Sequence, residues 1–140
     1  MEAKFSPRVK DVITFSKKEA IRLGNDHIEV EHLLLGMIHE GSGKGIRILM
    51  EFNLNLTQIK EEIELGLKKI SVSNVNPLSN IPLVKQAEKV LKMTYLEAKV
   101  FKSGIIGTEH LLLSILKNED SIACATLNKY GVIYENVKDE

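Results

Sequence analysis

Several features common in other protein classes are scarce or missing in this chain of 140 residues. It has no tryptophan, and its three tyrosines and four phenylalanines are too few for the stacking platforms of single-stranded nucleic-acid binders. The one cysteine, Cys124, excludes a disulfide within the chain and is typical of a reducing compartment. The 19 basic and 19 acidic residues cancel, so charge indicates neither nucleic acid nor an anionic membrane as a partner. No apolar run approaches membrane-spanning length and no signal peptide follows Met1, so we expect a soluble, cytoplasmic protein.

What the chain does contain is an internal repeat. Residues 31–35 recur without a change at residues 109–113, which lie 78 positions further along. Neighbouring positions correspond at the same offset, so that Ile28 falls on Ile106. A period of this length indicates one supersecondary unit that is used twice.

Each copy shows the apolar spacing of amphipathic helices. In the first helix of copy one, Ser6 supplies an N-cap, Pro7 suits the first turn, and Gly24 marks the end. We expect helices over residues 7–23, 29–40, 46–52 and 56–69 in copy one, and over 83–101, 108–116, 122–130 and from 133 onward in copy two.

No segment alternates polar and apolar residues as a half-buried strand would. We therefore predict an all-α domain built from two pseudo-symmetric four-helix repeats, packed through a pseudo-twofold interface. Repeat 1 covers residues 5–70, repeat 2 covers 82–140, and residues 71–81 have no helical period and form the linker. The last helix of repeat 2 is shorter than its counterpart in repeat 1, so we expect a fragment of a longer protein.

The glycine-rich segment 41–45 resembles a phosphate-binding loop only superficially. A P-loop needs a glycine five positions before its Gly-Lys pair and a hydroxyl directly after it. Ile38 and Gly45 occupy those two positions, so we interpret the segment as a flexible turn between helices.

Metal binding is also not indicated, because the four histidines (His27, His32, His39 and His110) form no HExxH motif or Cys/His cluster. His32 and His110 occupy equivalent repeat positions, which favours a role in the fold through hydrogen bonds to the backbone. Cys124 lies beside apolar residues and is interpreted as a core side chain rather than a nucleophile.

Glu31 and Glu109 leave two interpretations open. Each lies in the first turn of a helix, where a glutamate on a solvated surface simply complements the helix dipole. Alternatively, the equivalent positions mark two carboxylates beside helix N-termini, whose free N–H groups bind anions. A carboxylate beside an anion site suits a ligand that contains both a guanidinium and a phosphate.

These motifs, namely residues 19–24, 31–36 and 107–113, resemble the Clp N-terminal repeat domain. That domain precedes the ATPase modules of Clp/Hsp100 unfoldases such as ClpC, and the resemblance covers nearly the whole chain. It implies two pseudo-symmetric four-helix repeats and a non-catalytic role in a bacterial cytoplasm. The expected partners are adaptor proteins, protein substrates, the ClpP protease and the parent ATPase hexamer, with no nucleic acid or membrane, and we expect the isolated domain to be a monomer. The domain itself would hold no cofactor, because ATP and Mg²⁺ would bind in the ATPase modules.

The resemblance also implies a ligand. Some ClpC domains read phosphoarginine as a degradation mark, and the glutamate after Gly-Thr holds its guanidinium. Copy two keeps that motif as Gly107, Thr108 and Glu109, whereas Glu29 and Val30 precede Glu31 in copy one.

Val30 supplies no N-cap hydroxyl, and Glu29 adds negative charge, so we expect phosphoarginine at copy two rather than copy one. Two further interpretations remain: a stand-alone repeat protein that modulates a Clp protease, and a small enzyme, for which no motif was found.

Overall fold

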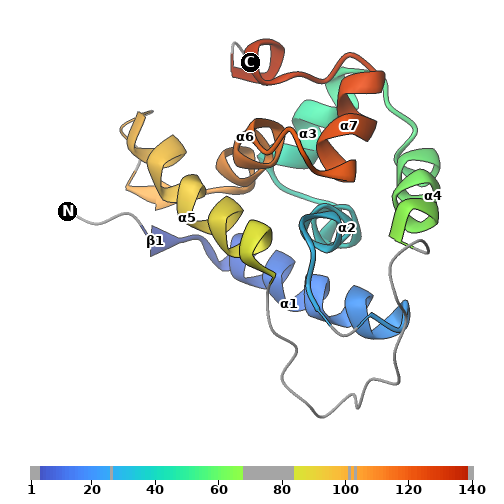
Figure 1. The fold of residues 1–140 in the computed structure, drawn as a ribbon. Helices are drawn as coiled ribbons and strands as arrows, with labels where there is room; N and C mark the ends of the chain where they lie inside the picture. Colours follow the sequence, from blue (N-terminus) through green and yellow to red (C-terminus); the bar gives the residue numbers. More distant parts are fainter. Residues whose placement is uncertain (1–3, 26, 68–83, 101, 103, 139–140) are drawn as a thin grey trace.

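The fold consists of helices packed around two central ones, which contain residues 33–35 and 111–113. The computed structural model describes residues 4–25, 27–67, 84–100, 102 and 104–138 (Figure 1). Its elements, in chain order, are β1 (Lys4–Phe5), α1 (Pro7–Arg22), α2 (Val30–Glu40), α3 (Lys44–Glu51), α4 (Leu56–Leu67), α5 (Lys85–Val100), β2 (Ile105–Ile106), α6 (Thr108–Lys117), α7 (Ile122–Lys129) and α8 (Tyr134–Lys138).

The expected all-α double repeat is confirmed, and a helix is found at each expected place, with those bounds that fall on described residues within about two residues of expectation. The Ser6 hydroxyl accepts the Val9 N–H at 3.1 Å and caps α1, as the sequence indicated. The expected linker at 71–81, and residues 68–69 and 139–140 of the expected fourth helices, lie outside the described residues.

A pair of two-residue strands was not expected from the sequence. Lys4 and Phe5 pair in parallel with Ile105 and Ile106, and two residues are too few to show the alternation that identifies a strand. The pairing is part of a contact between the copies, because Ser6 N–H donates to the Ile106 carbonyl at 2.9 Å.

The same exchange occurs in the opposite direction. Val84, which corresponds to Ser6, donates its N–H to the Ile28 carbonyl at 3.1 Å, and Ile28 corresponds to Ile106. The start of the first helix of each copy is therefore bound to the segment before the second helix of the other copy, as pseudo-twofold packing requires.

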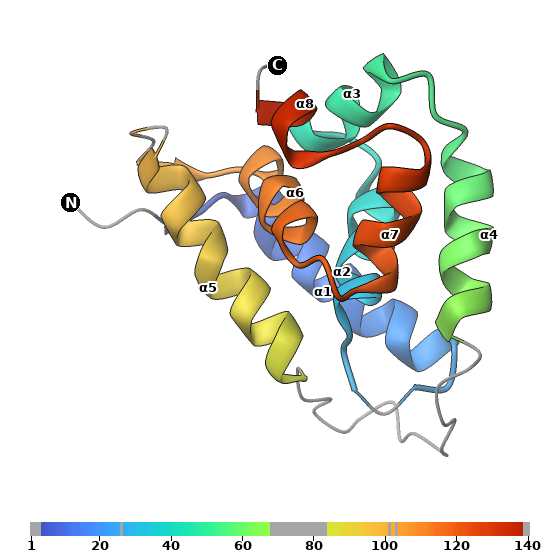
Figure 2. The ribbon, with the colours of Figure 1, turned by 45° about the horizontal axis from the view of Figure 1, so that its top comes forward.

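The leucine triplets form the centre of the core. Residues 33–35 on α2 and 111–113 on α6 are buried, and α2 lies at the middle of the molecule (Figure 1). Between the copies, α3 packs on α6, α4 packs on α7, and α2 contacts α5, α6 and α7. Figure 2 shows α4 beside α7 and α5 beside α6. Deleting one buried leucine side chain from such a core costs about 2–5 kcal/mol.

One difference between the two first-to-second helix crossings lies at residue 36 and its counterpart, residue 114. In copy one, a Cβ on Gly36 would overlap the Ser16 hydroxyl and the Val12 carbonyl, so α1 and α2 meet closely. In copy two the equivalent residue is Ser114, whose hydroxyl donates to the Val90 carbonyl at 2.6 Å. The α1–α2 contact is accordingly more extensive than the α5–α6 contact.

Candidate functional site

The two repeated glutamates lie in different environments. Glu31, in the first turn of α2, is only 5% exposed. Its Oε2 accepts the N–H of Ala123, in the first turn of α7, at 3.0 Å. This N–H belongs to the other copy and has no partner within its own helix, because the first turn of a helix leaves its donors free. The Glu31 carboxylate therefore caps α7 from across the interface.

In copy two, the equivalent contact has a different acceptor. The N–H of Gly45, in the first turn of α3, corresponds to that of Ala123 and donates to the Thr108 hydroxyl at 2.9 Å. Thr108 is 2% exposed, and its counterpart in copy one is Val30, which has no hydroxyl. Copy two thus caps the opposite helix without using its glutamate.

Within the described part of the chain, Glu109 therefore caps no other helix and lies at the N-terminus of its own helix, α6. Its carboxylate folds back over Gly107, where a Cβ on residue 107 would overlap Oε1 of Glu109. The side chain is half-buried and lines a cavity of about 570 Å³ between α1, α3 and the start of α6.

This cavity contains both signs of charge. Three cationic side chains and three carboxylates line it, together with the first turn of α6. The cations are Arg8 of α1 and Lys44 and Arg47 of α3; the carboxylates are Asp11, Glu40 and Glu109.

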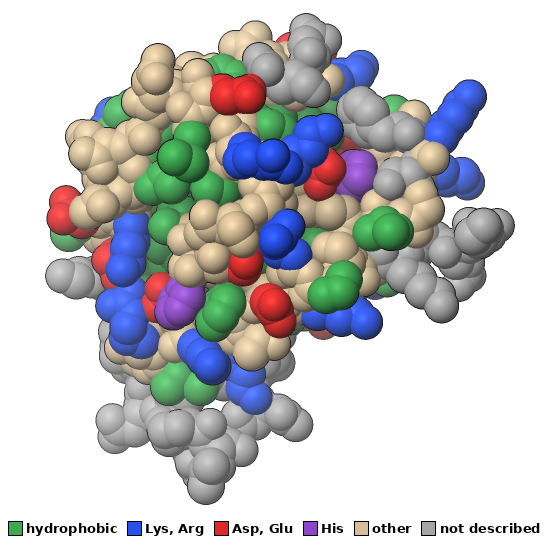
Figure 3. Space-filling model, turned by 180° about the vertical axis from the view of Figure 1, so that it is seen from behind, with side chains coloured by type: hydrophobic (Ala, Val, Ile, Leu, Met, Phe, Trp, Pro, Cys, Tyr) green, Lys and Arg blue, Asp and Glu red, His purple; other side chains and the backbone are tan. Residues whose placement is uncertain are grey.

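One cation and one carboxylate of this cavity, Arg8 and Glu40, form an ion pair. Arg8 Nε lies 3.6 Å from Glu40 Oε1, and Glu40 also accepts the Ser42 N–H at 3.0 Å. Lys44 and Arg47 extend from the first and second turns of α3, close to a helix N-terminus that favours anions. Seen from behind, Lys and Arg side chains lie among Asp and Glu side chains and exposed hydrophobic ones (Figure 3). The cavity can therefore receive a ligand with a cationic and an anionic group.

The repeated histidines serve the fold, as the sequence indicated. His32 Nδ1 accepts the Glu29 N–H at 2.8 Å, and His110 Nδ1 accepts the Gly107 N–H at 2.9 Å. The second ring nitrogen of His32 lies 2.9 Å from Asn25 Oδ1. An accepting Nδ1 requires a neutral ring, and burial lowers the pKa of His32 to about 4 and also lowers the pKa of His110. Both rings therefore hold the N-cap backbone of α2 and α6.

Cys124 is buried in α7, which confirms the core role expected for it. Burial raises the pKa of its thiol, and its Sγ lies 3.3 Å from the Leu116 carbonyl. Among the residues that the structure describes, no three His, Cys, Asp or Glu side chains gather as a metal site would require. In the same part of the chain, no helix is both long and apolar enough to cross a bilayer.

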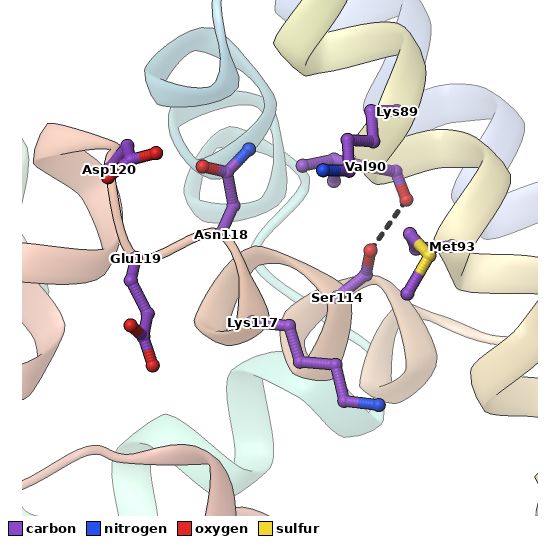
Figure 4. Close-up of a pocket in the computed structure, with 8 residues that line it drawn as sticks. All are labelled: Lys89, Val90, Met93, Ser114, Lys117, Asn118, Glu119 and Asp120. Carbon is purple, nitrogen blue, oxygen red and sulfur yellow. Dashed lines mark hydrogen bonds between the residues drawn. The ribbon is translucent and has the colours of Figure 1, made fainter.

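A second cavity, of about 380 Å³, lies between α5 and the end of α6 (Figure 4). Ser114 points across it to the Val90 carbonyl, and Met93 and Lys89 project from α5. At the equivalent place in copy one, the Phe15 and His39 rings stack on each other with centroids 4.2 Å apart. The two copies therefore differ in this groove as well as in their glutamates.

The four residues singled out from the sequence do not share one place. Gly107, Thr108 and Glu109 lie together at the larger cavity, whereas Glu31 faces α7. Sequence reasoning missed the cationic side of that cavity, formed by Arg8, Lys44 and Arg47. The repeat offset could have identified it, since uncharged residues stand at the equivalent positions, namely Gln86, Ile122 and Ala125.

Comparison with known proteins places this architecture in a family. The family model described as "Clp repeat (R) N-terminal domain" matches residues 4–130. The chaperone protein ClpB of Oceanobacillus iheyensis is 33% identical over 140 residues, which is the whole of this chain and 17% of that protein. The negative regulator of genetic competence ClpC/MecB of Bacillus subtilis is 29% identical over the same length, again 17% of that protein.

A solved structure shows the same fold. The N-terminal domain of Hsp104 from Candida albicans aligns with a TM-score of 0.76 at 16% identity, covering 97% of this chain and 87% of that one. The chain spans less than a fifth of the curated relatives named above. Because it has the double repeat and the shared motifs and matches this family model, the chain belongs to the Clp N-terminal repeat domain family.

Proposed function

We propose that the chain is the non-catalytic recruiting domain of a Clp-type ATP-dependent unfoldase that works with the ClpP protease in the bacterial cytoplasm. It would bind adaptor proteins and protein substrates, while ATP and Mg²⁺ would bind in ATPase modules outside this sequence. Family membership supports this proposal, as does the match to only 17% of each much longer ClpB and ClpC relative. The isolated domain would be a monomer, and the ATPase modules would form the hexamer.

We further propose that the domain reads phosphoarginine through copy two. The observation that supports it is that Glu109 shares one cavity with Arg8, Lys44 and Arg47. The Glu109 carboxylate would hold the guanidinium, because paired N–H donors match a carboxylate in geometry and charge. The phosphoryl group would lie against the cations at the start of α3, where the helix dipole adds to their attraction.

This mixed charge makes the ligand specific. Unmodified arginine would satisfy Glu109 but leave the cations of α3 unused, and a phosphoserine would do the reverse. At about 4 Å and surface-like screening, each such charge pair is worth a few kcal/mol at most, and the discrimination comes from needing both.

A calorimetric titration tests the proposal. A peptide with one phosphoarginine is compared with the same peptide containing arginine or phosphoserine. We expect binding of the phosphoarginine peptide alone, lost in Glu109→Gln and weakened at least tenfold in Arg47→Gln, because each change removes one of the two charge contacts. Equal binding of all three peptides, or none of the phosphoarginine peptide, would refute phosphoarginine reading and leave recruitment through other surface contacts.

A further inference from the structure

The two copies cap each other's third helix at equivalent places. In each case a backbone N–H in the first turn receives an acceptor from the second helix of the opposite copy. For Gly45 of α3 the acceptor is the Thr108 hydroxyl, at 2.9 Å. For Ala123 of α7 it is the Glu31 carboxylate, at 3.0 Å. Both hydrogen bonds are buried, so an unsatisfied donor would be costly at either place.

The acceptor differs because two neighbouring residues differ. Val30 has no hydroxyl to offer where Thr108 has one, so the Ala123 N–H needs another acceptor. In addition, Gly107 leaves free the space in which the Glu109 carboxylate lies, and a Cβ there would overlap Oε1. Copy one has Glu29 at that position. Its Cβ would exclude the Glu31 carboxylate from the place that Glu109 takes in copy two.

We propose that Glu29 and Val30 convert Glu31 from a ligand-binding carboxylate into a structural cap of α7, so that the domain holds one ligand rather than two. The inference rests on the proposed function where it concerns the ligand, whereas the capping role stands on the contacts alone. The specificity-determining positions are thus 29 and 30 in copy one, and 107 and 108 in copy two.

The surroundings of Glu31 agree with a closed site. Arg8, Lys44 and Arg47, which copy one contributes to the cavity beside Glu109, correspond in copy two to the uncharged Gln86, Ile122 and Ala125. Ile122 instead packs on α4, where a Cβ added to Gly66 would lie 2.9 Å from its Cγ2. An anion at the start of α7 would meet an apolar contact in place of a lysine.

Urea denaturation tests the cap without any ligand. We expect Glu31→Ala to raise the unfolding equilibrium constant on the order of tenfold, because it removes the acceptor of a buried N–H. Adding Val30→Thr in the same chain should restore most of this loss, since the new hydroxyl stands where Thr108 does in copy two. Glu109→Ala is the matched control and should change stability little. If Val30→Thr restores nothing, or both alanine variants behave alike, the cap is refuted.

The reverse exchange tests the same idea in copy two. The double variant Gly107→Ala/Thr108→Val reproduces the copy-one pattern, so Glu109 should turn to the Gly45 N–H and stability should be largely kept. Thr108→Val/Glu109→Ala leaves that N–H without an acceptor and should be clearly less stable. Equal stability of the two double variants would overturn the exchange.

Ligand titrations separate this inference from the proposed function. With the phosphoarginine peptide, wild-type protein and Val30→Thr/Glu31→Ala should each bind one equivalent, and Gly107→Ala/Thr108→Val should bind none. Two equivalents on wild type, one of them lost in Val30→Thr/Glu31→Ala, would refute the single site. No binding by wild type would refute phosphoarginine reading, while the denaturation series would still decide the role of Glu31.

Discussion

Replacing Gly36 with alanine should destabilise the domain, although alanine is the better helix former. A Cβ at residue 36 would overlap the Val12 carbonyl and the Ser16 hydroxyl and would lie 2.9 Å from the Ser16 N. Two of these atoms are backbone, so α1 must move as a unit to make room. This crossing therefore gives a sharp test of the close α1–α2 packing.

The magnitude follows from two opposing effects. Alanine in place of glycine within a helix stabilises by about 1 kcal/mol. Overpacking a close-packed core, with the backbone shifts that it forces, costs about 1–3 kcal/mol. Because two of the overlapping atoms are backbone, we take the top of this range. The net loss is then about 2 kcal/mol, which corresponds to a fall in Tm of roughly 6 °C for a domain of this size.

The repeat supplies a matched control. Ser114 stands at the equivalent position, and Ser114→Ala removes its hydrogen bond to the Val90 carbonyl without adding bulk. That carbonyl keeps the Thr94 hydroxyl as a donor, at 2.7 Å, so the loss should stay below about 1 kcal/mol. The assay is thermal and urea unfolding of both variants beside wild type. A Gly36→Ala protein as stable as wild type would refute the close crossing.

Two further outcomes are expected. Burial lowers the pKa of His32 to about 4, so below about pH 6.5 the unfolded chain binds a proton that the folded chain does not. The free energy of unfolding should therefore be unaffected by this residue above about pH 6.5 and should fall by up to about 3 kcal/mol toward pH 4. Urea unfolding between pH 7 and 4.5 should show a weaker pH dependence for His32→Asn than for wild type, and equal slopes would contradict this. The buried Cys124, whose thiol pKa is raised, should react with a thiol reagent slowly in the native protein and rapidly in urea; fast native labelling would show that α7 opens readily.

The helices and their repetition could be predicted from the sequence because the repeat is long and strongly periodic. The identical residues 31–35 and 109–113 predicted one unit used twice with a helix in each copy, and the structure places them at the start of α2 and α6 with their leucines buried. The β1–β2 pair could not be predicted, since two-residue strands show no pattern and their partners lie far apart in the chain. Helix caps and turns can be predicted from residues that are neighbours in the sequence, whereas the pairing of β1 with β2 depends on how the two copies pack against each other.

The same limit applied to the candidate site. The missing hydroxyl at Val30 was visible in the sequence, but the donor that needs it, the Ala123 N–H, comes from the other copy. Arg8 and Arg47 lie on different helices and line one cavity with Glu109 only through the packing of α1 and α3 on α6. Chemistry formed by one turn of helix could be predicted, and chemistry formed across the pseudo-twofold interface could not.

Backbone amide shifts of the isotope-labelled domain would locate the ligand. On titration with the phosphoarginine peptide, we predict changes in the amide chemical shifts of residues 43–47 and 107–109. The amide shifts of residues 121–125, which include Ala123, should stay unchanged. Shifts of equal size at both sets of residues would contradict a single site in copy two and return Glu31 to the role of a second ligand-binding carboxylate.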